Sequence, residues 1–409
     1  MLLAVLLVKA GLSQESVGEY EQLLYLGTLL TSFWVTGLMQ ALLARYPQLQ
    51  EEQRSAWLGN AYLFFTVGGG SLLLLFWLSR RWWLPWLLGE PELPLLGLFL
   101  LYAWLNLSSF LLDHFLLLWR NTAVLLWGSM LSHAAQLPAM LLPVWYGYGL
   151  EGALLGLLAV GAGRQIWLVL LLSRHRAFRY DLSLLRGWLL LSLPLIAYAL
   201  VGTVSVSFDS WLVSWYYSGD EERFAVFRYG AREFPLALAL AAAFSSAMIP
   251  EVAGHLQAGL KTLRTKSLRL FHLLFPLSAG LMLSSNWWFP LLFSPDYLPS
   301  VPLFNTFMLI TISRLVFSRT VLVALSANRA VFYFSLLELL LNVALGFALV
   351  GPYGLIGIAW ATVLAYTLDK VLLAWYLYRR FGIAPSRYLH PGWFFFYCAL
   401  LSGAYALSV

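Results

Sequence analysis

Apolar residues stand in long blocks along this chain, each roughly 17 to 25 residues long, with short polar segments between them. A block of this length matches a helix that crosses about 30 Å of hydrocarbon, whereas strands of a transmembrane barrel would alternate between polar and apolar residues. The pattern therefore predicts thirteen membrane helices, of which the first and the last are short. They are expected near residues 1–12, 20–43, 57–78, 94–118, 122–145, 150–173, 188–217, 223–249, 270–293, 301–325, 330–350, 354–378 and 393–409.

Composition supports this class of protein, because 61% of the 409 residues are hydrophobic and only 11% are charged. So few polar side chains cannot cover a soluble particle. We therefore expect an all-α integral membrane protein. Residues 1–8 are apolar, with no basic region before them and no cleavage site after them, so we expect a first helix that lacks a turn or two and not a signal peptide.

The basic residues divide unevenly between the two sides that these helices define. Fifteen lie in the loops of one side and four in the loops of the other, so the first side is expected to be cytoplasmic. The formal charge of +6 is then mostly a topology signal, and nothing in it favours nucleic acid as a partner. The six remaining basic residues lie within predicted helices: Arg164, Arg228, Arg232, Arg314, Arg319 and Lys370.

The chain also repeats itself at half its length. The segment RWWLPWLLGEPELP at 81–94 returns as NWWFPLLFSPDYLP at 286–299, and YGLEGALLG from Tyr148 returns as YGLIGIAWA from Tyr353, so both residue numbers rise by 205. The repeat contains six helices, and an even number returns the chain to its starting side of the membrane. The two halves are therefore expected to be related by an axis along the membrane normal, as in parallel-repeat transporters, with a central cleft between them.

These patterns suggest a domain organisation. We expect an N-terminal six-helix lobe with a truncated first helix over 1–178 and a cytoplasmic linker over 179–187. A second six-helix lobe over 188–382 and a linker with an additional hydrophobic helix over 383–409 would complete the chain.

A series of positions stands in a characteristic order along the chain: Gly18, Tyr20, Gly37, Arg45, Asp209, Tyr229, Ala231, Pro250, Asn342 and the segment YGLIGIAWAT at 353–362. Taken together, they resemble the polysaccharide flippases of the MOP exporter superfamily, with the Wzx-type O-antigen flippases as the nearest group. The resemblance implies two six-helix lobes around a hydrophilic cavity, as in MATE transporters. It also implies export of an undecaprenyl-pyrophosphate-linked oligosaccharide across the bacterial cytoplasmic membrane. The truncated first helix and the thirteenth segment depart from the pattern.

Charged residues within membrane helices are costly and usually face a cavity or each other, so they are the candidate site residues. Arginines in a wet cleft would form a pyrophosphate clamp, since a guanidinium offers paired donors to phosphate oxygens. The alternative is that they form internal ion pairs or extend to the headgroups. The substrate-binding candidates are Arg232, Arg314, Arg164, Arg228 and Arg319; the ion-pair or coupling candidates are Asp209, Glu233, Glu338 and Asp369.

Spacing refines these candidates. Asp209 and Arg228 lie at similar depths on either side of a turn, as do Arg319 and Glu338, so ion pairs are favoured for Arg228 and Arg319. For Arg232, Arg314 and Arg164 the clamp and the ion pair stay equally open. Lys370 is near the cytoplasmic end of its helix and is expected to extend toward the headgroups. Asp113 is expected either to line the cavity or to lie at the interface.

Several other motifs lack the structural surroundings that their usual function requires. GYGLEG at 147–152 has the form GxGxxG, but it is a turn between membrane helices and follows no strand. The histidines are scattered and the single cysteine, Cys398, lies in an apolar helix, so no metal, disulfide or cofactor is expected. Most tryptophans, including Trp82, Trp83, Trp287 and Trp288, are expected to anchor the helices at the interface.

Three functions stay open from the sequence. The first is a flippase that shields the glycan head group in the cavity by alternating access, and this protein would not be an enzyme. A multidrug or cation antiporter of the MATE type would favour acidic residues in the cavity, where this chain has arginines. A membrane glycosyltransferase or polysaccharide polymerase would need a large outer loop or an acidic catalytic pair. The expected partners are the lipid-linked oligosaccharide, the bilayer and other polysaccharide assembly proteins, with the chain acting as a monomer.

Overall fold

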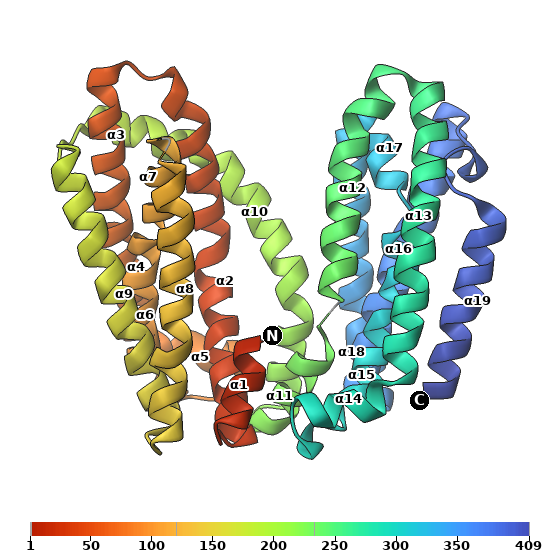
Figure 1. Cartoon of the computed structure of the whole chain (residues 1–409), viewed down its shortest axis with the longest axis horizontal. Coiled ribbons are helices and arrows are strands. Elements are labelled where there is room, and N and C mark those ends of the chain that lie inside the picture. Colours follow the sequence, from red (N-terminus) through yellow and green to blue (C-terminus); the bar gives the residue numbers. More distant parts are fainter. Residues whose placement is uncertain (1, 120, 233, 409) are drawn as a thin grey trace. The chain divides into compact units, whose positions relative to one another are not determined.

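In the computed structural model the described residues, 2–119, 121–232 and 234–408, form helices and connecting segments and contain no strand (Figure 1). They cluster into two compact units, Met1–Ala225 and Val226–Val409. The first unit contains α1 (Leu2–Lys9), α2 (Gln14–Arg45), η1 (Tyr46–Gln48), α3 (Glu51–Leu63), the π-helical η2 (Phe64–Gly68), α4 (Gly69–Leu78), α5 (Arg80–Leu88), α6 (Leu96–Ser109), α7 (Leu111–Leu118), α8 (Thr122–Trp145), α9 (Gly149–Arg174) and α10 (Leu182–Tyr216).

Helix α11 (Glu221–Gly230) crosses the boundary between the units. The second unit continues with α12 (Pro235–Gly254), α13 (Leu256–Leu283), α14 (Ser285–Leu292), η3 (Pro295–Tyr297), α15 (Ser300–Met308), α16 (Ile310–Arg314), α17 (Ser318–Ala324), α18 (Asn328–Phe381), η4 (Pro385–Arg387) and α19 (Pro391–Ser408).

The helices confirm the expected all-α membrane fold. Within the described ranges, seven helices are long and apolar enough to cross a membrane, or up to nine if each of two bent pairs is one span. The thirteen predicted segments exceed this number, and two of the differences have a clear physical reason. Helix α1 is too short to cross, and α18 joins two predicted helices in one element that is kinked at Gly354.

The repeat in the sequence is also a repeat in the structure. The Trp83 indole donates a hydrogen bond to the Phe76 carbonyl at 2.9 Å, and at the equivalent place in the second half the Trp288 indole donates to the Leu281 carbonyl at 3.1 Å. Both tryptophans lie on short helices, α5 and α14, and the α13–α14 pair is bent by 75°. Their neighbours Trp82 and Trp287 are 87% and 84% exposed, which suits anchors at an interface.

Glycine marks a second equivalent point. Gly149 begins α9 with φ 57°, and its counterpart Gly354 has φ 60° between the two halves of α18. Both residues follow the tyrosine of the repeated YGL motif. Because side chains larger than hydrogen disfavour positive φ, glycine at this position allows one helix to end and the next to start without a long loop.

The first unit is organised around α2 and α10, which pack closely along their length. A Cβ atom on Gly37 would lie 2.5 Å from the Ile196 backbone nitrogen, so only glycine lets the helices come this close. The Trp188 indole donates to the Leu38 carbonyl at 3.1 Å. This packing places α10 in the first unit, and the units divide after Ala225 instead of at the expected linker 179–187. The two predicted six-helix lobe ranges stay a prediction.

Within residues 179–187, Asp181 caps the start of α10. Its carboxylate accepts hydrogen bonds from the Ser183 hydroxyl and from the backbone nitrogens of Ser183 and Leu184. The Ser183 hydroxyl, with the backbone donors, lowers the pKa of the Asp181 carboxyl. The segment therefore contains a defined helix start, as expected for an N-terminal cap that accepts the free N–H groups.

In the second unit, α19 packs on the outer side of α13, beside it in Figure 1. The Tyr397 ring stacks on Phe275 with 5.2 Å between centroids, and its hydroxyl lies 2.6 Å from His272 Nδ1. Asn305 Nδ2 donates to the Ser408 hydroxyl at 3.1 Å. The additional hydrophobic helix predicted near 393–409 is thus fastened to its unit by polar contacts.

We predict that Gly354→Ala lowers the free energy of unfolding by about 1–3 kcal/mol, because its φ of 60° and ψ of −140° belong to a region that essentially only glycine adopts. Denaturant unfolding in detergent micelles measures this change. The matched control is Gly403→Ala in α19, where φ is helical and a Cβ meets nothing within 4 Å. Equal stability of both variants would contradict the role given to Gly354.

Candidate functional site

A polar cavity of about 250 Å³ lies in the second unit, between α12, α16, α17 and α18. Three of its lining side chains are cationic and one is a carboxylate, which is unusual among membrane-spanning helices. The lining residues are Ala241, Ala242, Ser245, Arg314, Val316, Phe317, Arg319, Thr320, Glu338, Tyr366 and Lys370.

One wall of the cavity is a cluster of four charged side chains. Arg319 Nη2 lies 3.1 Å from Glu338 Oε2 and 3.2 Å from Asp369 Oδ2. Lys370 Nζ lies 2.6 Å from the same Asp369 oxygen. The Asp369 side chain is fully buried, whereas the Arg319 side chain is 40% exposed. Two cations and two carboxylates thus neutralise each other, which lowers the cost of placing them inside a helix bundle.

The kink at Gly354 explains why the two carboxylates meet. Glu338 lies 16 residues before Gly354 (354 − 338), and Asp369 lies 15 residues after it (369 − 354). Since a helix rises about 1.5 Å per residue, the two positions lie at nearly the same depth on the antiparallel halves of α18. This spacing was available in the sequence as a signal that Glu338 and Asp369 share a site.

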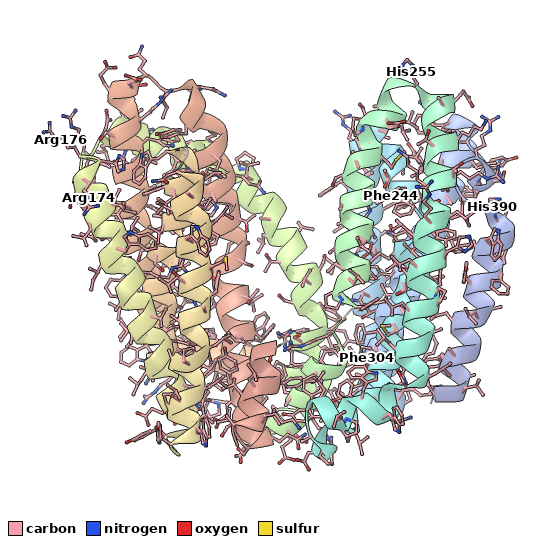
Figure 2. The ribbon with its side chains drawn as sticks, in the orientation of Figure 1. Arg174, Arg176, Phe244, His255, Phe304 and His390 are labelled. Carbon is pink, nitrogen blue, oxygen red and sulfur yellow. The ribbon has the colours of Figure 1, made fainter. Side chains whose placement is uncertain are left out.

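Arg314 lines the same cavity from α16. Its guanidinium carbon lies 6.0 Å from the centroid of the Tyr366 ring, at the edge of the range for a cation–π contact. On α12, the Ser245 hydroxyl lies 2.6 Å from the Thr320 hydroxyl. Next to Ser245, Phe244, labelled in Figure 2, meets the ring of Phe317 edge-on at 4.8 Å. Cationic, hydroxyl and aromatic groups therefore surround one space.

The structure contains the ion pair of Arg319 with Glu338 that the spacing favoured, and it corrects the expectation for Lys370. The Lys370 side chain does not extend toward the headgroups, since it is only 13% exposed and lies in the cluster. The physical reason is the buried carboxylate of Asp369, which offers the ammonium group a closer counter-charge than the interface does.

In the first unit, Arg164 on α9 forms an ion pair with Asp113 on α7, with 3.0 Å between Nη2 and Oδ2. The other Asp113 oxygen accepts a hydrogen bond from the Ser129 hydroxyl at 2.8 Å. The Arg164 side chain is 8% exposed, and its Nε is buried with no hydrogen-bond partner. Of the two open readings for Arg164, the described contacts favour the internal ion pair.

This ion pair and that of Arg319 with Asp369 occupy equivalent places in the repeat with opposite polarity. Arg164 plus 205 is Asp369, and Asp113 plus 205 is Ser318, the neighbour of Arg319. Each pair joins the same two segments of its repeat, since α7 corresponds to α17 and α9 to the second half of α18. The position therefore requires a pair of opposite charges, and it does not fix which helix has the cation.

The remaining candidates are Asp209, Arg228, Arg232 and Glu233. Arg232 Nε donates to the Arg228 carbonyl at 3.2 Å, and the Arg232 guanidinium lies 5.0 Å from the Tyr229 ring centroid. Asp209 lies on α10 in the first unit and Arg228 in the second, so their predicted ion pair stays a prediction. The same holds for a clamp at Arg232. Glu233 lies outside the described residues.

Comparison with known families gives the context for this site. A family described as "Polysaccharide biosynthesis protein" matches residues 12–302, well over half of the chain. The chain belongs to this family. No curated protein sequence matches it.

Several solved structures share the fold of this polysaccharide biosynthesis protein. The lipid II flippase MurJ in an inward closed conformation superposes with a TM-score of 0.69 and 15% identity, over 99% of this chain and 95% of that one. An inward-facing MATE multidrug transporter superposes with a TM-score of 0.62 and 15% identity, over 100% of this chain and 95% of that one. A point mutant of the Vibrio cholerae MATE transporter VcmN superposes with a TM-score of 0.55 and 16% identity, over 92% of this chain and 91% of that one. The resemblance to the MOP superfamily is confirmed, and at these identities the likeness concerns the fold.

We predict that Asp113→Asn lowers the free energy of unfolding by about 2–3 kcal/mol, because it leaves a nearly buried guanidinium without its counter-charge; partial exposure of Asp113 reduces the full effect. Combining Arg164→Met with Asp113→Leu is expected to restore most of the stability, since both charges are then gone. Denaturant unfolding of the three proteins in micelles tests this. Unchanged stability together with lost transport would instead make Arg164 a substrate contact.

Proposed function

We propose that this protein is a flippase that moves a polyprenyl-pyrophosphate-linked oligosaccharide from the inner to the outer leaflet of the bacterial cytoplasmic membrane. It would act by alternating access, as a transporter and not as an enzyme. Membership in a polysaccharide biosynthesis family and a fold shared with a lipid II flippase support the proposal.

The observation that carries the proposal is the cationic lining of the cavity in the second unit. Arg314, Arg319 and Lys370 line it together with Glu338, and the buried Asp369 pairs with Arg319 and Lys370, so three cations meet two carboxylates. Charges among membrane-spanning helices are costly, so an excess of cations around a cavity suits a substrate with negative charge. A pyrophosphate offers that charge, and arginine binds it with paired, charge-assisted hydrogen bonds.

The ion-pair cluster suggests how binding would be coupled to the protein. Arg319 already contacts Glu338 and Asp369, so a pyrophosphate that enters the cavity would compete with these carboxylates for its guanidinium. Glu338 and Asp369 lie on opposite sides of the kink in α18. A change in their shared contact would therefore bias the angle between the two halves of that helix, which is the kind of two-state element that alternating access needs.

A MATE-type cation antiporter is the second candidate. It is favoured by the likeness to MATE transporters and by Glu338, which gives the cavity an acidic side chain. The cationic excess of the same lining argues against a positively charged drug. Efflux of a cationic dye from vesicles separates the two functions, because the flippase is expected to show none.

The proposed function predicts that cells lacking this protein accumulate complete lipid-linked oligosaccharide on the cytoplasmic leaflet, because assembly of the glycan continues while its translocation stops. Mass analysis of extracted lipids and a sidedness assay in vesicles measure this. Shortened or unpolymerised glycan on the outer leaflet would overturn the proposal in favour of a polymerase or transferase.

Arg314→Ala is expected to reduce export roughly tenfold or more, since hydrogen bonds to charged groups contribute about 1.5–3 kcal/mol. Arg314→Lys should lie between the wild type and the alanine variant, because it retains the charge and loses the paired donors. The matched control is Arg329→Ala at the exposed start of α18, which should export normally. Normal export by both Arg314 variants would remove this residue from the substrate site.

A further inference from the structure

A second, apolar groove runs along the first unit, with a volume of about 700 Å³. Helices η2 and α4 form one side and α6 the other. Leu73 and Leu100 are only 3% and 5% exposed and form the floor, while Leu74 and Leu101 are 55% and 44% exposed and form the rim. Since α4 and α6 belong to helices able to cross a membrane, this groove lies at the depth of the hydrocarbon.

Two tryptophan–glycine crossings define the shape of the groove. A Cβ on Gly70 of α4 would lie 2.5 Å from Trp104 Nε1, and a Cβ on Gly97 of α6 would lie 3.1 Å from Trp77 Nε1. Each indole thus covers a glycine of the opposite helix. Trp104 also donates to the Thr66 carbonyl at 2.7 Å, within the π-helical turn. On each helix two turns separate the tryptophan from the glycine, so the crossings enclose about 10 Å of groove.

The repeat identifies the equivalent surface in the second unit, where α19 covers it. There α13 and α15 contact α19 through His272, Phe275, Asn305 and Thr306. Subtracting 205 from these four positions gives Val67, Gly70, Leu100 and Leu101, and all four line the groove of the first unit. The groove is therefore the counterpart of a surface that holds a helix.

The chemistry of the two surfaces differs at these positions. In the second unit His272 bonds with Tyr397, Asn305 with Ser408, and Thr306 with the Tyr405 hydroxyl at 3.1 Å. In the first unit the equivalent side chains belong to Val67, Leu100 and Leu101, which offer no hydrogen bond. Such a surface cannot hold a helix by these polar contacts, and it suits an occupant made of hydrocarbon alone.

We propose that this groove binds the polyprenyl chain of the lipid-linked substrate, which extends the proposed function by giving the tail a fixed place while the head group crosses. Lipid tails are as apolar as the groove, so binding there depends on close packing and not on the hydrophobic effect. The branch methyls of a polyprenyl chain give it a wider cross-section than a saturated acyl chain, so it makes more contacts with the walls of such a groove. The equivalent surface of the second unit holds a helix about 10 Å wide. A space of similar width suits a branched chain better than a slender one.

Photolabelling tests this proposal in vesicles that contain the full chain. The probe is a polyprenyl phosphate with a diazirine in its chain, and the comparison is phosphatidylcholine with the same group in an acyl chain. We expect the polyprenyl probe to label peptides from residues 64–78 and 96–104, and an excess of unlabelled phosphatidylcholine to leave this labelling unchanged.

A matched pair of variants on α4 sharpens the test. Leu74→Trp fills the groove from its rim and should reduce labelling about tenfold, the factor expected for the loss of on the order of ten carbon–carbon contacts. Leu75→Trp adds the same side chain at the next position, which is 60% exposed and lies outside the lining, and should label like the wild type.

Three results would overturn the proposal: equal labelling by the phosphatidylcholine probe, equal labelling of Leu74→Trp and the wild type, or a transmembrane helix of another protein cross-linked along α4 and α6. Photolabelling detects binding and does not require transport, so the proposed groove and the proposed flippase function can fail separately. Absent labelling with normal glycan export would refute the groove alone. Groove labelling without any glycan translocation would refute the flippase while the polyprenyl site stands.

Discussion

A charge placed among membrane-spanning helices must meet an opposite charge or a polar space, and much of this protein follows from that constraint. Arg164 meets Asp113 in the first unit, and Arg319 and Lys370 meet Glu338 and Asp369 in the second. The exposed part of the second cluster borders the polar cavity between α12, α16, α17 and α18. The ion pairs therefore join helices in both units, and those of the second unit also place Arg319 and Lys370 at the wall of the cavity.

The internal repeat supplies one scaffold for two different purposes. Equivalent tryptophans bond to equivalent carbonyls, and Gly149 and Gly354 both adopt positive φ, so the backbone course is shared. On this scaffold the ion pair has reversed polarity, and one outer surface holds α19 while its counterpart forms an apolar groove. Side-chain chemistry has diverged where the backbone has not, because helix packing constrains size and shape more strongly than it constrains charge.

Several features could be predicted from single residues and spacing. The pair of Arg319 with Glu338 follows from their matched distances to a turn, and the membrane helices follow from block length. Lys370 was predicted wrongly, since its distance from a helix end says nothing about a carboxylate in the core of the same bundle. The partner of Arg164 was equally hidden, because Asp113 lies far away along the chain and on another helix.

The sequence by itself determined the class of protein, most of the helical segments and the internal repeat, because composition and block length act locally along the chain. The order of its motifs, by resemblance, pointed to the family. Tertiary structure alone decided the partners of Arg164 and Lys370, which of the arginines line a cavity, and which of two equivalent surfaces is covered by α19. These outcomes depend on the angles and depths at which distant helices pack. Residues far apart along the chain meet only through such packing, as Arg164 on α9 meets Asp113 on α7.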